Sequence, residues 1–253
     1  MPSSRKIRTI IKSKPVVEGA GVHLRRVFGF SEAPRLDPFL MLDDFRSDNP
    51  EDYRKGFPWH PHRGIETITY VLRGDVAHGD SLGNSGVISS GDVQWMTAGS
   101  GIIHQEMPKG DAQGSMHGFQ LWANLPAAQK MRPPRYRGIT ADQIPQVEME
   151  NGVRIKVIAG SLRRVHGPMD AIVIDPEYFD CRVPDGETFV HPTDPRYTAF
   201  IYVIGGQGRT DETVVENGTL VLFGASPRST STSSVNTSRG LRMGRVQRKR
   251  TTP

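Results

Sequence analysis

Two short pairs of polar side chains constrain the fold of this chain more than any other feature. The first pair is His60 and His62, and the second is His104 and Glu106. Side chains two positions apart in an extended strand point to the same face, so each pair would occupy one face of one strand. If these faces meet across the wall of a barrel, three imidazoles and a carboxylate converge on one point. The two pairs therefore predict a metal site.

The residues between the two pairs have the composition of short strands separated by turns. Residues 66–72 are rich in β-branched and aromatic side chains, and shorter apolar runs follow at residues 87–88 and 93–96. Clusters of Gly, Asp, Asn and Ser lie between these runs and favour turns. The 27 glycines and 19 prolines of the whole chain also favour many turns. This pattern predicts an all-β fold with a small antiparallel barrel or jelly roll.

A weaker copy of the strand pattern follows in the second half of the chain. Residues 199–206 resemble residues 67–74, and both runs end in a glycine-bearing turn. The positions that correspond to His60 and His62 carry no histidine in this copy. The second half is therefore expected to keep the strands and lose the metal ligands.

The charge of the chain is unevenly distributed. The formal net charge is +5, but residues 225–253 contain seven basic residues and no acid, which leaves about −2 for the first 224 residues. This balance gives no support to a basic face on the folded part, so no specific nucleic-acid binding is expected. Residues 225–253 are rich in Ser, Thr and Arg and have few apolar side chains, which predicts a disordered tail.

Three sequence observations bear on the location of the protein. No run of 18 apolar residues is present, so no transmembrane helix and no membrane association are expected. The N-terminus lacks the apolar segment of a secretory signal. The single cysteine, Cys181, cannot form an internal disulfide and is expected to be a small buried side chain. A cytoplasmic monomer is the prediction.

Four longer motifs resemble the pirin family of the cupin superfamily. They occupy residues 57–67, 91–99, 101–107 and 120–126, and the resemblance extends over about residues 5–224. It implies a bicupin, with two antiparallel β-barrels of the jelly-roll type in tandem. On this basis we expect an N-terminal metal-binding cupin domain, a C-terminal metal-free cupin domain and a tail; these segments are residues 1–130, 131–224 and 225–253.

The C-terminal barrel departs from the family pattern. In pirins, further apolar strands follow the run that ends here at residues 223–224, whereas this chain continues with the Ser/Thr-rich basic tail. The sequence leaves two alternatives open, an incomplete second barrel or a reading frame that is altered near the end. Neither alternative touches the predicted metal site.

The resemblance also implies the metal and its ligands. The family's three histidines and one glutamate correspond to His60, His62, His104 and Glu106, and the usual metal is Fe(II). The donor types alone do not identify the metal, because Zn, Mn, Ni, Co and Cu accept the same ligands.

Two functions follow from the resemblance. Some pirins resemble quercetin 2,3-dioxygenase, which implies an oxidoreductase that opens the ring of a flavonol-like aromatic substrate with O2. In such an enzyme Glu106 could detach and act as the catalytic base for the substrate hydroxyl. Mammalian pirins are nuclear, iron-dependent transcription cofactors, which implies instead a non-catalytic iron-binding regulator that reports metal or redox state to a protein partner. Both functions need the same four ligands.

Three aromatic side chains near the two pairs are candidates for a substrate pocket. They are Phe57, Trp59 and Trp95. Simple packing inside a barrel is the alternative interpretation for each of them.

Overall fold

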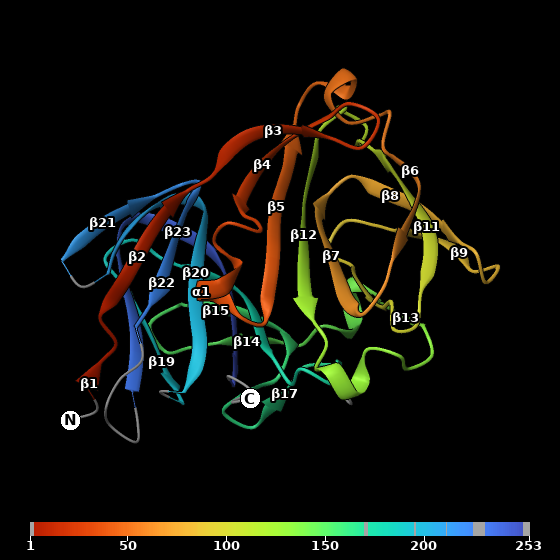
Figure 1. Cartoon of the computed structure of the whole chain (residues 1–253). Helices are drawn as coiled ribbons and strands as arrows, with labels where there is room; N and C mark the ends of the chain where they lie inside the picture. The colour runs from red at the N-terminus through yellow and green to blue at the C-terminus, as the bar shows by residue number, and fades with distance from the viewer. Residues whose placement is uncertain (1–2, 170–171, 195, 211, 225–230, 250–253) are drawn as a thin grey trace. The chain divides into compact units, whose positions relative to one another are not determined.

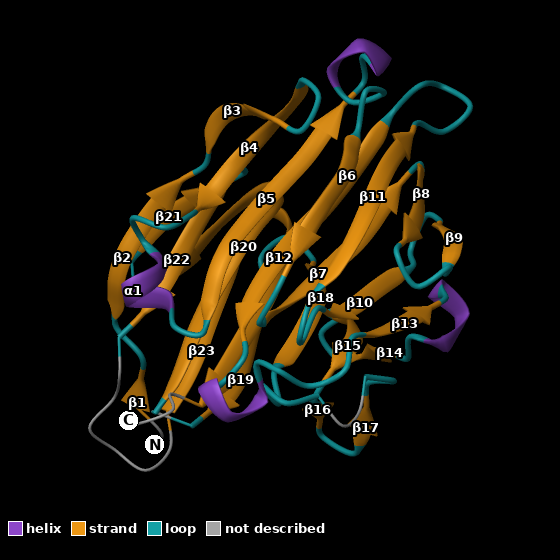
Figure 2. Cartoon of the chain, turned by 45° about the vertical axis from the view of Figure 1, so that its right-hand side comes forward, coloured by secondary structure: helices purple, strands orange, loops and turns teal. Residues whose placement is uncertain are grey.

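The structure is a computed structural model that describes residues 3–169, 172–194, 196–210, 212–224 and 231–249. Strands make up nearly all of its regular structure, and the helices are short (Figure 2). The prediction of an all-β fold is therefore confirmed. The chain divides into two compact units (Figure 1), which we call the N-terminal unit, residues 14–143, and the C-terminal unit, residues 1–13 and 144–253.

The N-terminal unit contains two antiparallel sheets within its described residues. The larger has the strand order β13-β10-β7-β12-β5-β4-β3, and the smaller has the order β6-β11-β8-β9. The strands are β3 (Lys14–Glu18), β4 (Val22–Phe28), β5 (Phe39–Ser47), β6 (Phe57–His62), β7 (Ile65–Arg73), β8 (Asp75–Asp80), β9 (Ser85–Ile88), β10 (Val93–Thr97), β11 (Ile102–Lys109), β12 (Met116–Asn124) and β13 (Arg135–Ile139). The helices are α1 (Ala33–Leu36) and the 3-10 turns η1 (Pro50–Asp52), η2 (Ala127–Gln129) and η3 (Ala141–Gln143).

Side chains from both sheets form one core in the N-terminal unit. Leu24, Phe45 and Val71 come from the larger sheet, and Val76 and Ile88 come from the smaller sheet. All five are buried, because each strand points alternate side chains inward. This packing holds the inner face of the smaller sheet, which carries the predicted ligands, against the larger sheet.

The C-terminal unit is built on a ten-stranded sheet with the central order β14-β15-β18-β23-β20-β22-β2. Its strands are β1 (Ser3–Ser4), β2 (Ile7–Lys12), β14 (Gln146–Glu148), β15 (Arg154–Ala159), β18 (Glu177–Val183), β19 (Thr188–Thr193), β20 (Tyr197–Thr210), β21 (Thr213–Glu216), β22 (Thr219–Phe223) and β23 (Ser231–Lys249). The short strands β16 (Ser161–Leu162) and β17 (Val165–His166) pair separately. Cys181 is buried in the apolar core of this unit, as expected.

The two units do not begin and end where the sequence pattern placed the domains, at residues 1–130 and 131–224. β2 pairs with β22, so the start of the chain belongs to the C-terminal unit. β13 pairs with β10, so the N-terminal unit extends beyond residue 130. Strand pairing between distant segments determines both boundaries. Changes in local composition along the sequence do not reveal this pairing.

Part of the segment for which the sequence predicts a disordered tail lies within the described residues. The backbone of residues 231–249 forms β23, which pairs with β18, β19 and β20 and lies between β18 and β20 in the sheet. The strand therefore lies inside the sheet of the C-terminal unit, for which the sequence left open an incomplete barrel or an altered reading frame. The prediction counted apolar side chains, whereas pairing in a ladder uses the backbone N–H and C=O groups that every non-proline residue carries. Residues 225–230 and 250–253 lie outside the described residues.

None of the helices within the described residues is long and apolar enough to cross a membrane.

Candidate metal centre

The two predicted ligand pairs lie on neighbouring strands. β6 and β11 are antiparallel, with His60 directly opposite His104 and His62 opposite Ile102. Opposed residues of an antiparallel pair have their Cβ atoms about 5 Å apart on the same face. The pairs therefore lie side by side within the smaller sheet, and do not meet across the wall of a barrel as supposed from the sequence.

Local alternation explains why the ligands point inward. The burial of β11 alternates along the strand, so that Ile102, His104 and Glu106 are buried while Ile103 is exposed. The register between β6 and β11 shifts between His104 and Glu106, which places Phe57 opposite Glu106. Because of this irregularity, the pairing of His60 with His104 does not continue in the same register to Glu106.

The three imidazole rings form a compact cluster. The ring centroids lie 4.8 Å apart for His60 and His62, 4.5 Å for His60 and His104, and 5.0 Å for His62 and His104. One nitrogen from each ring lies within 4.8 Å of the other two, a spacing that could hold a metal ion. The cluster is the convergence that the sequence predicted for these three residues.

Hydrogen bonds at the outer nitrogens orient two of the rings. His60 Nδ1 lies 2.8 Å from the carbonyl oxygen of Pro58, which can only accept, so Nδ1 carries a hydrogen, and in a neutral ring this leaves the lone pair on Nε2. His104 Nδ1 lies 3.1 Å from the hydroxyl oxygen of Tyr136. The Nε2 atoms of His60 and His104 then face each other at 3.0 Å.

The surroundings of the third ring, that of His62, indicate whether these residues fit a metal ion. His62 Nε2 is buried and has no hydrogen-bond partner among the described residues. An unpartnered polar atom inside a protein is costly unless something satisfies it. An ion held by three imidazole nitrogens would do so, and divalent transition metals accept this donor set. The residues present therefore fit a metal ion.

The protonation of the cluster also suits metal binding. Burial, together with the neighbouring His104 and His60, lowers the pKa of His62 to about 3. Burial and the nearby His60 lower the pKa of His104 to about 3 as well. Both rings are consequently neutral at pH 7, which is the state that binds a metal.

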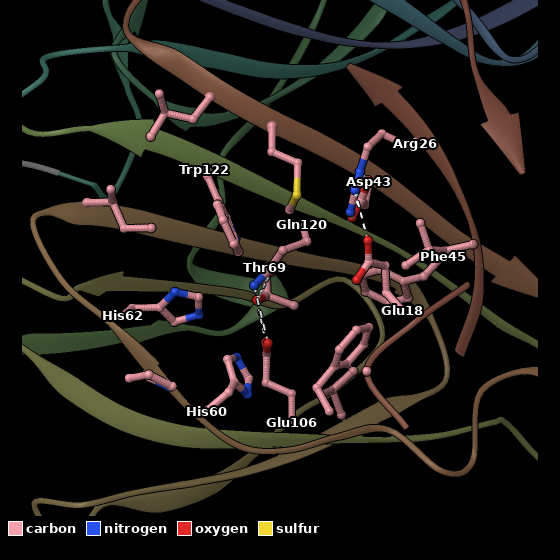
Figure 3. A pocket seen from close by; sticks show the side chains of 18 of the residues that line it. Glu18, Arg26, Asp43, Phe45, His60, His62, Thr69, Glu106, Gln120 and Trp122 are labelled. Atoms are coloured by element: carbon pink, nitrogen blue, oxygen red, sulfur yellow. Dashed lines mark hydrogen bonds and ion pairs between the residues drawn. The ribbon is translucent and has the colours of Figure 1, made fainter. Parts of the chain in front are cut away.

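Glu106 is buried beside the cluster and is held by two polar neighbours (Figure 3). Thr69 Oγ1 donates to Glu106 Oε1 at 2.9 Å, and Gln120 Nε2 donates to Oε2 at 3.2 Å. Oε2 lies 3.9 Å from His104 Nε2. Burial raises the pKa of the Glu106 carboxyl, while the hydrogen bond from Thr69 opposes the rise. The structure thus places the predicted fourth ligand beside His104 with both of its oxygens hydrogen-bonded, while the group of residues spaced to hold an ion contains the three histidines without Glu106.

A cavity of about 530 Å³ opens from the cluster toward the larger sheet. His60, His62 and Glu106 contribute to its lining, together with the apolar side chains of Phe57 and Trp122. This volume is within the range of about 300–1,000 Å³ for small-molecule pockets. The centre can therefore hold an ion and still leave room for an organic ligand.

Of the three predicted pocket residues, Phe57 lines this cavity and the other two do not. Trp59 is 55% exposed on β6. Trp95 is buried, but it lies opposite Ile68 on β7 and so shares the face of Ile68, whereas Thr69, the next residue of β7, lines the cavity. The tryptophan of the cavity is Trp122, which packs edge-on against His62 at a centroid distance of 5.0 Å.

Sequence reasoning missed Trp122, Gln120 and Tyr136. The alternation of residues 116–124 could have indicated Gln120 and Trp122, because they flank the buried Leu121 and share the opposite face of β12. Nothing in the sequence indicates Tyr136. Only the pairing of β13 with β10 brings it to His104.

Substituting Tyr136 by phenylalanine should weaken metal binding about 10-fold, because outer-shell partners of metal-ligating histidines commonly contribute 10–100-fold. Burial raises the pKa of the Tyr136 phenol, so the hydroxyl stays protonated and its oxygen can accept from His104 Nδ1. Phenylalanine keeps the ring, which stacks on His78, and removes only the acceptor. Competition for Zn²⁺ against a chelator measures the change. Tyr197→Phe, in the C-terminal unit, is the control, and equal Zn²⁺ affinities for the two variants would contradict a role for Tyr136.

Comparison with known proteins shows which family this chain resembles over most of its length. The family model described as Pirin matches residues 21–123. The chain is 46% identical over 213 residues to a "Pirin-like protein" of Caulobacter vibrioides, covering 84% of this chain and 77% of that one. It is 43% identical over 210 residues to a "Putative quercetin 2,3-dioxygenase" of Pseudomonas aeruginosa, covering 81% and 73%.

A solved structure extends the similarity to the whole fold. Quercetin 2,3-dioxygenase from Acinetobacter baumannii is 28% identical and matches with a TM-score of 0.88, covering 98% of this chain and 88% of that chain. This similarity is consistent with the bicupin arrangement that the family resemblance implied. The identity to the relatives, maintained over most of both chains, shows that this chain belongs to the pirin family.

Proposed function

We propose that the chain is a metal-dependent dioxygenase of the pirin type, which opens the ring of quercetin-like flavonols with O2. The observation that carries the proposal is the cavity of about 530 Å³, in which His60 and His62 of the three-histidine cluster face apolar walls. The names of the Pseudomonas aeruginosa relative and of the Acinetobacter baumannii structure support the same reaction class. A purely structural metal site would need no such cavity.

We propose His60, His62 and His104 as the metal ligands, with Glu106 as the fourth and Fe(II) as the metal. When bound, Fe(II) would supply the redox chemistry toward O2 and polarise the hydroxy-ketone of a flavonol. The histidines would supply neutral nitrogen donors whose outer hydrogen bonds orient the rings.

Glu106 is the proposed base for the substrate hydroxyl. Its burial raises the pKa of the carboxyl, which makes the carboxylate a stronger proton acceptor than an exposed one. Thr69 and Gln120 hold one oxygen each, so the carboxylate keeps a defined orientation toward the cavity. Phe57 and Trp122 would exclude water from the reacting groups.

Anaerobic loading with Fe(II), followed by addition of quercetin and O2, tests the proposal. We expect consumption of one O2 per flavonol at a rate well above that of the same concentration of free Fe(II). An oxygen electrode and the loss of flavonol absorbance measure the two quantities. Turnover no faster than that of free iron would reject the enzyme and leave the non-catalytic iron-binding regulator as the better account of these residues.

A further inference from the structure

The cavity has a second polar region, formed by an ion-paired group that we call the distal triad: Glu18, Arg26 and Asp43. Arg26 Nε and Nη2 donate to the two carboxylate oxygens of Asp43, each at 2.9 Å. Arg26 Nη1 donates to Glu18 Oε1 at 2.9 Å. All three side chains line the same cavity as His60, His62 and Glu106. The metal centre and the distal triad are therefore two parts of one binding space.

The backbone holds the distal triad in place. The three residues lie on the adjacent strands β3, β4 and β5, and Arg26 is directly opposite Asp43 in the ladder. A bidentate pair between a guanidinium and a carboxylate fixes both side chains in one plane. The side chain of Asp43 is only 5% exposed, whereas that of Glu18 is 42% exposed. Glu18 is thus the member that a ligand in the cavity can reach most easily.

The charges of the distal triad favour one class of ligand group. Two carboxylates and one guanidinium leave a formal charge of −1 on the distal triad. Three of the five N–H donors of Arg26 are already hydrogen-bonded to Asp43 and Glu18. Glu18 Oε2 has no hydrogen-bond partner among the described residues. A neutral hydroxyl group can donate to this oxygen, while a carboxylate or phosphate would meet excess negative charge.

The position of the distal triad suits the far end of an aromatic ligand. Figure 3 shows Thr69 and Gln120 between His62 on one side and Arg26 and Asp43 on the other. Phe45 and Phe57 supply aromatic walls in the same cavity. A flat ligand whose hydroxy-ketone faces the histidines would extend another ring toward Glu18.

We propose that the distal triad is a specificity subsite that accepts phenolic hydroxyl groups and rejects anionic groups, with Glu18 as the hydrogen-bond acceptor. This inference rests on the proposed function, because it assumes that a flavonol occupies the cavity. It adds the chemical class of substituent that the substrate must carry at the end away from the metal.

Equilibrium binding to the Zn²⁺-loaded protein tests the subsite without turnover, since Zn²⁺ has no redox chemistry. Three ligands share the same hydroxy-ketone: quercetin, 3-hydroxyflavone without further hydroxyls, and 3-hydroxyflavone-4′-carboxylate. We expect the wild type to bind quercetin about 10-fold more tightly than 3-hydroxyflavone, the scale of one hydrogen bond to a charged group. We expect the carboxylate to bind about 10-fold more weakly than 3-hydroxyflavone.

Glu18→Gln removes the negative charge and keeps the shape of the side chain. In this variant the preference for quercetin over 3-hydroxyflavone and the preference for 3-hydroxyflavone over its carboxylate should both fall to about 3-fold or less. The charged acceptor for the hydroxyl and the repulsion of the carboxylate are lost together. Glu51→Gln makes the same chemical change at an exposed ion pair with Arg54 and should keep the wild-type ratios. If the distal triad only clasps its strands together, Glu18→Gln would alter stability and leave both ratios unchanged.

The possible results separate the subsite from the reaction. Unchanged ratios in Glu18→Gln, or a wild type that binds the carboxylate as tightly as quercetin, would overturn the subsite even if Fe(II) supports ring opening. Ratios that change as expected would support the subsite even if no ring opening occurs with Fe(II). Failure of all three ligands to bind would reject both proposals.

Discussion

Replacing His62 by alanine should leave the protein with less than about one-tenth of its bound metal after dialysis. Three imidazole nitrogens converge within 4.8 Å, and His62 Nε2 is buried with no hydrogen-bond partner in the part of the chain that the structure describes. Loss of one of these donors should exceed the roughly 10–100-fold weakening that follows loss of an outer-shell partner. Elemental analysis of protein loaded with one equivalent of Zn²⁺ or Fe(II) measures the effect.

His166→Ala is the matched control for this substitution. His166 lies on β17 in the C-terminal unit, where Nδ1 is 2.8 Å from the hydroxyl of Ser161. Its removal should leave the metal content at the wild-type value. Equal metal contents in His62→Ala and His166→Ala would disprove the assignment of the ligands.

The metal-free protein should lose about 4 kcal/mol of its free energy of unfolding between pH 7.5 and pH 5.0. The pKa values of His62 and His104 are about 3 in the folded chain, against about 6.5 for an unfolded one. The unfolded state therefore binds more protons between these values, and stability falls as the pH falls below 6.5. At pH 5.0 each histidine accounts for about 2 kcal/mol of the loss, whether its folded pKa is 3 or 4.

Urea unfolding of chelator-treated protein at the two pH values measures this change. The double substitution of His62 and His104 by glutamine should abolish most of it, because the variant has no buried imidazoles at the centre to protonate. The same pH dependence in this variant and in the wild type would show that other groups are responsible. A wild-type stability that is equal at the two pH values would contradict the lowered pKa values themselves.

The candidate ligands could be picked out from the sequence because the signal that indicates them is local. An alternation of period two places His60 with His62, and His104 with Glu106, whatever the rest of the chain does. The same local rule indicates strands and turns, and hence an all-β fold. Phe57 was found in the same way, as a neighbour of the first pair along β6.

The remaining parts of the site depend on contacts between distant segments. Tyr136 reaches His104 only through the pairing of β13 with β10, and the distal triad exists only because β3, β4 and β5 are adjacent. The register of β10 against β7 directs Trp95 away from the cavity. A single sequence carries no readable record of register, because many pairings satisfy the same alternation.

The placement of the three histidines on neighbouring strands has a consequence for the stability of the protein in the cell. His60 and His104 are 44 positions apart along the chain, so an ion bound to both would cross-link the ends of a long loop. Such a cross-link disfavours the unfolded chain. Binding of the ion and folding of the smaller sheet are then coupled in one equilibrium. The supply of the ion in the cell would then govern how long each molecule survives degradation as well as whether it can react.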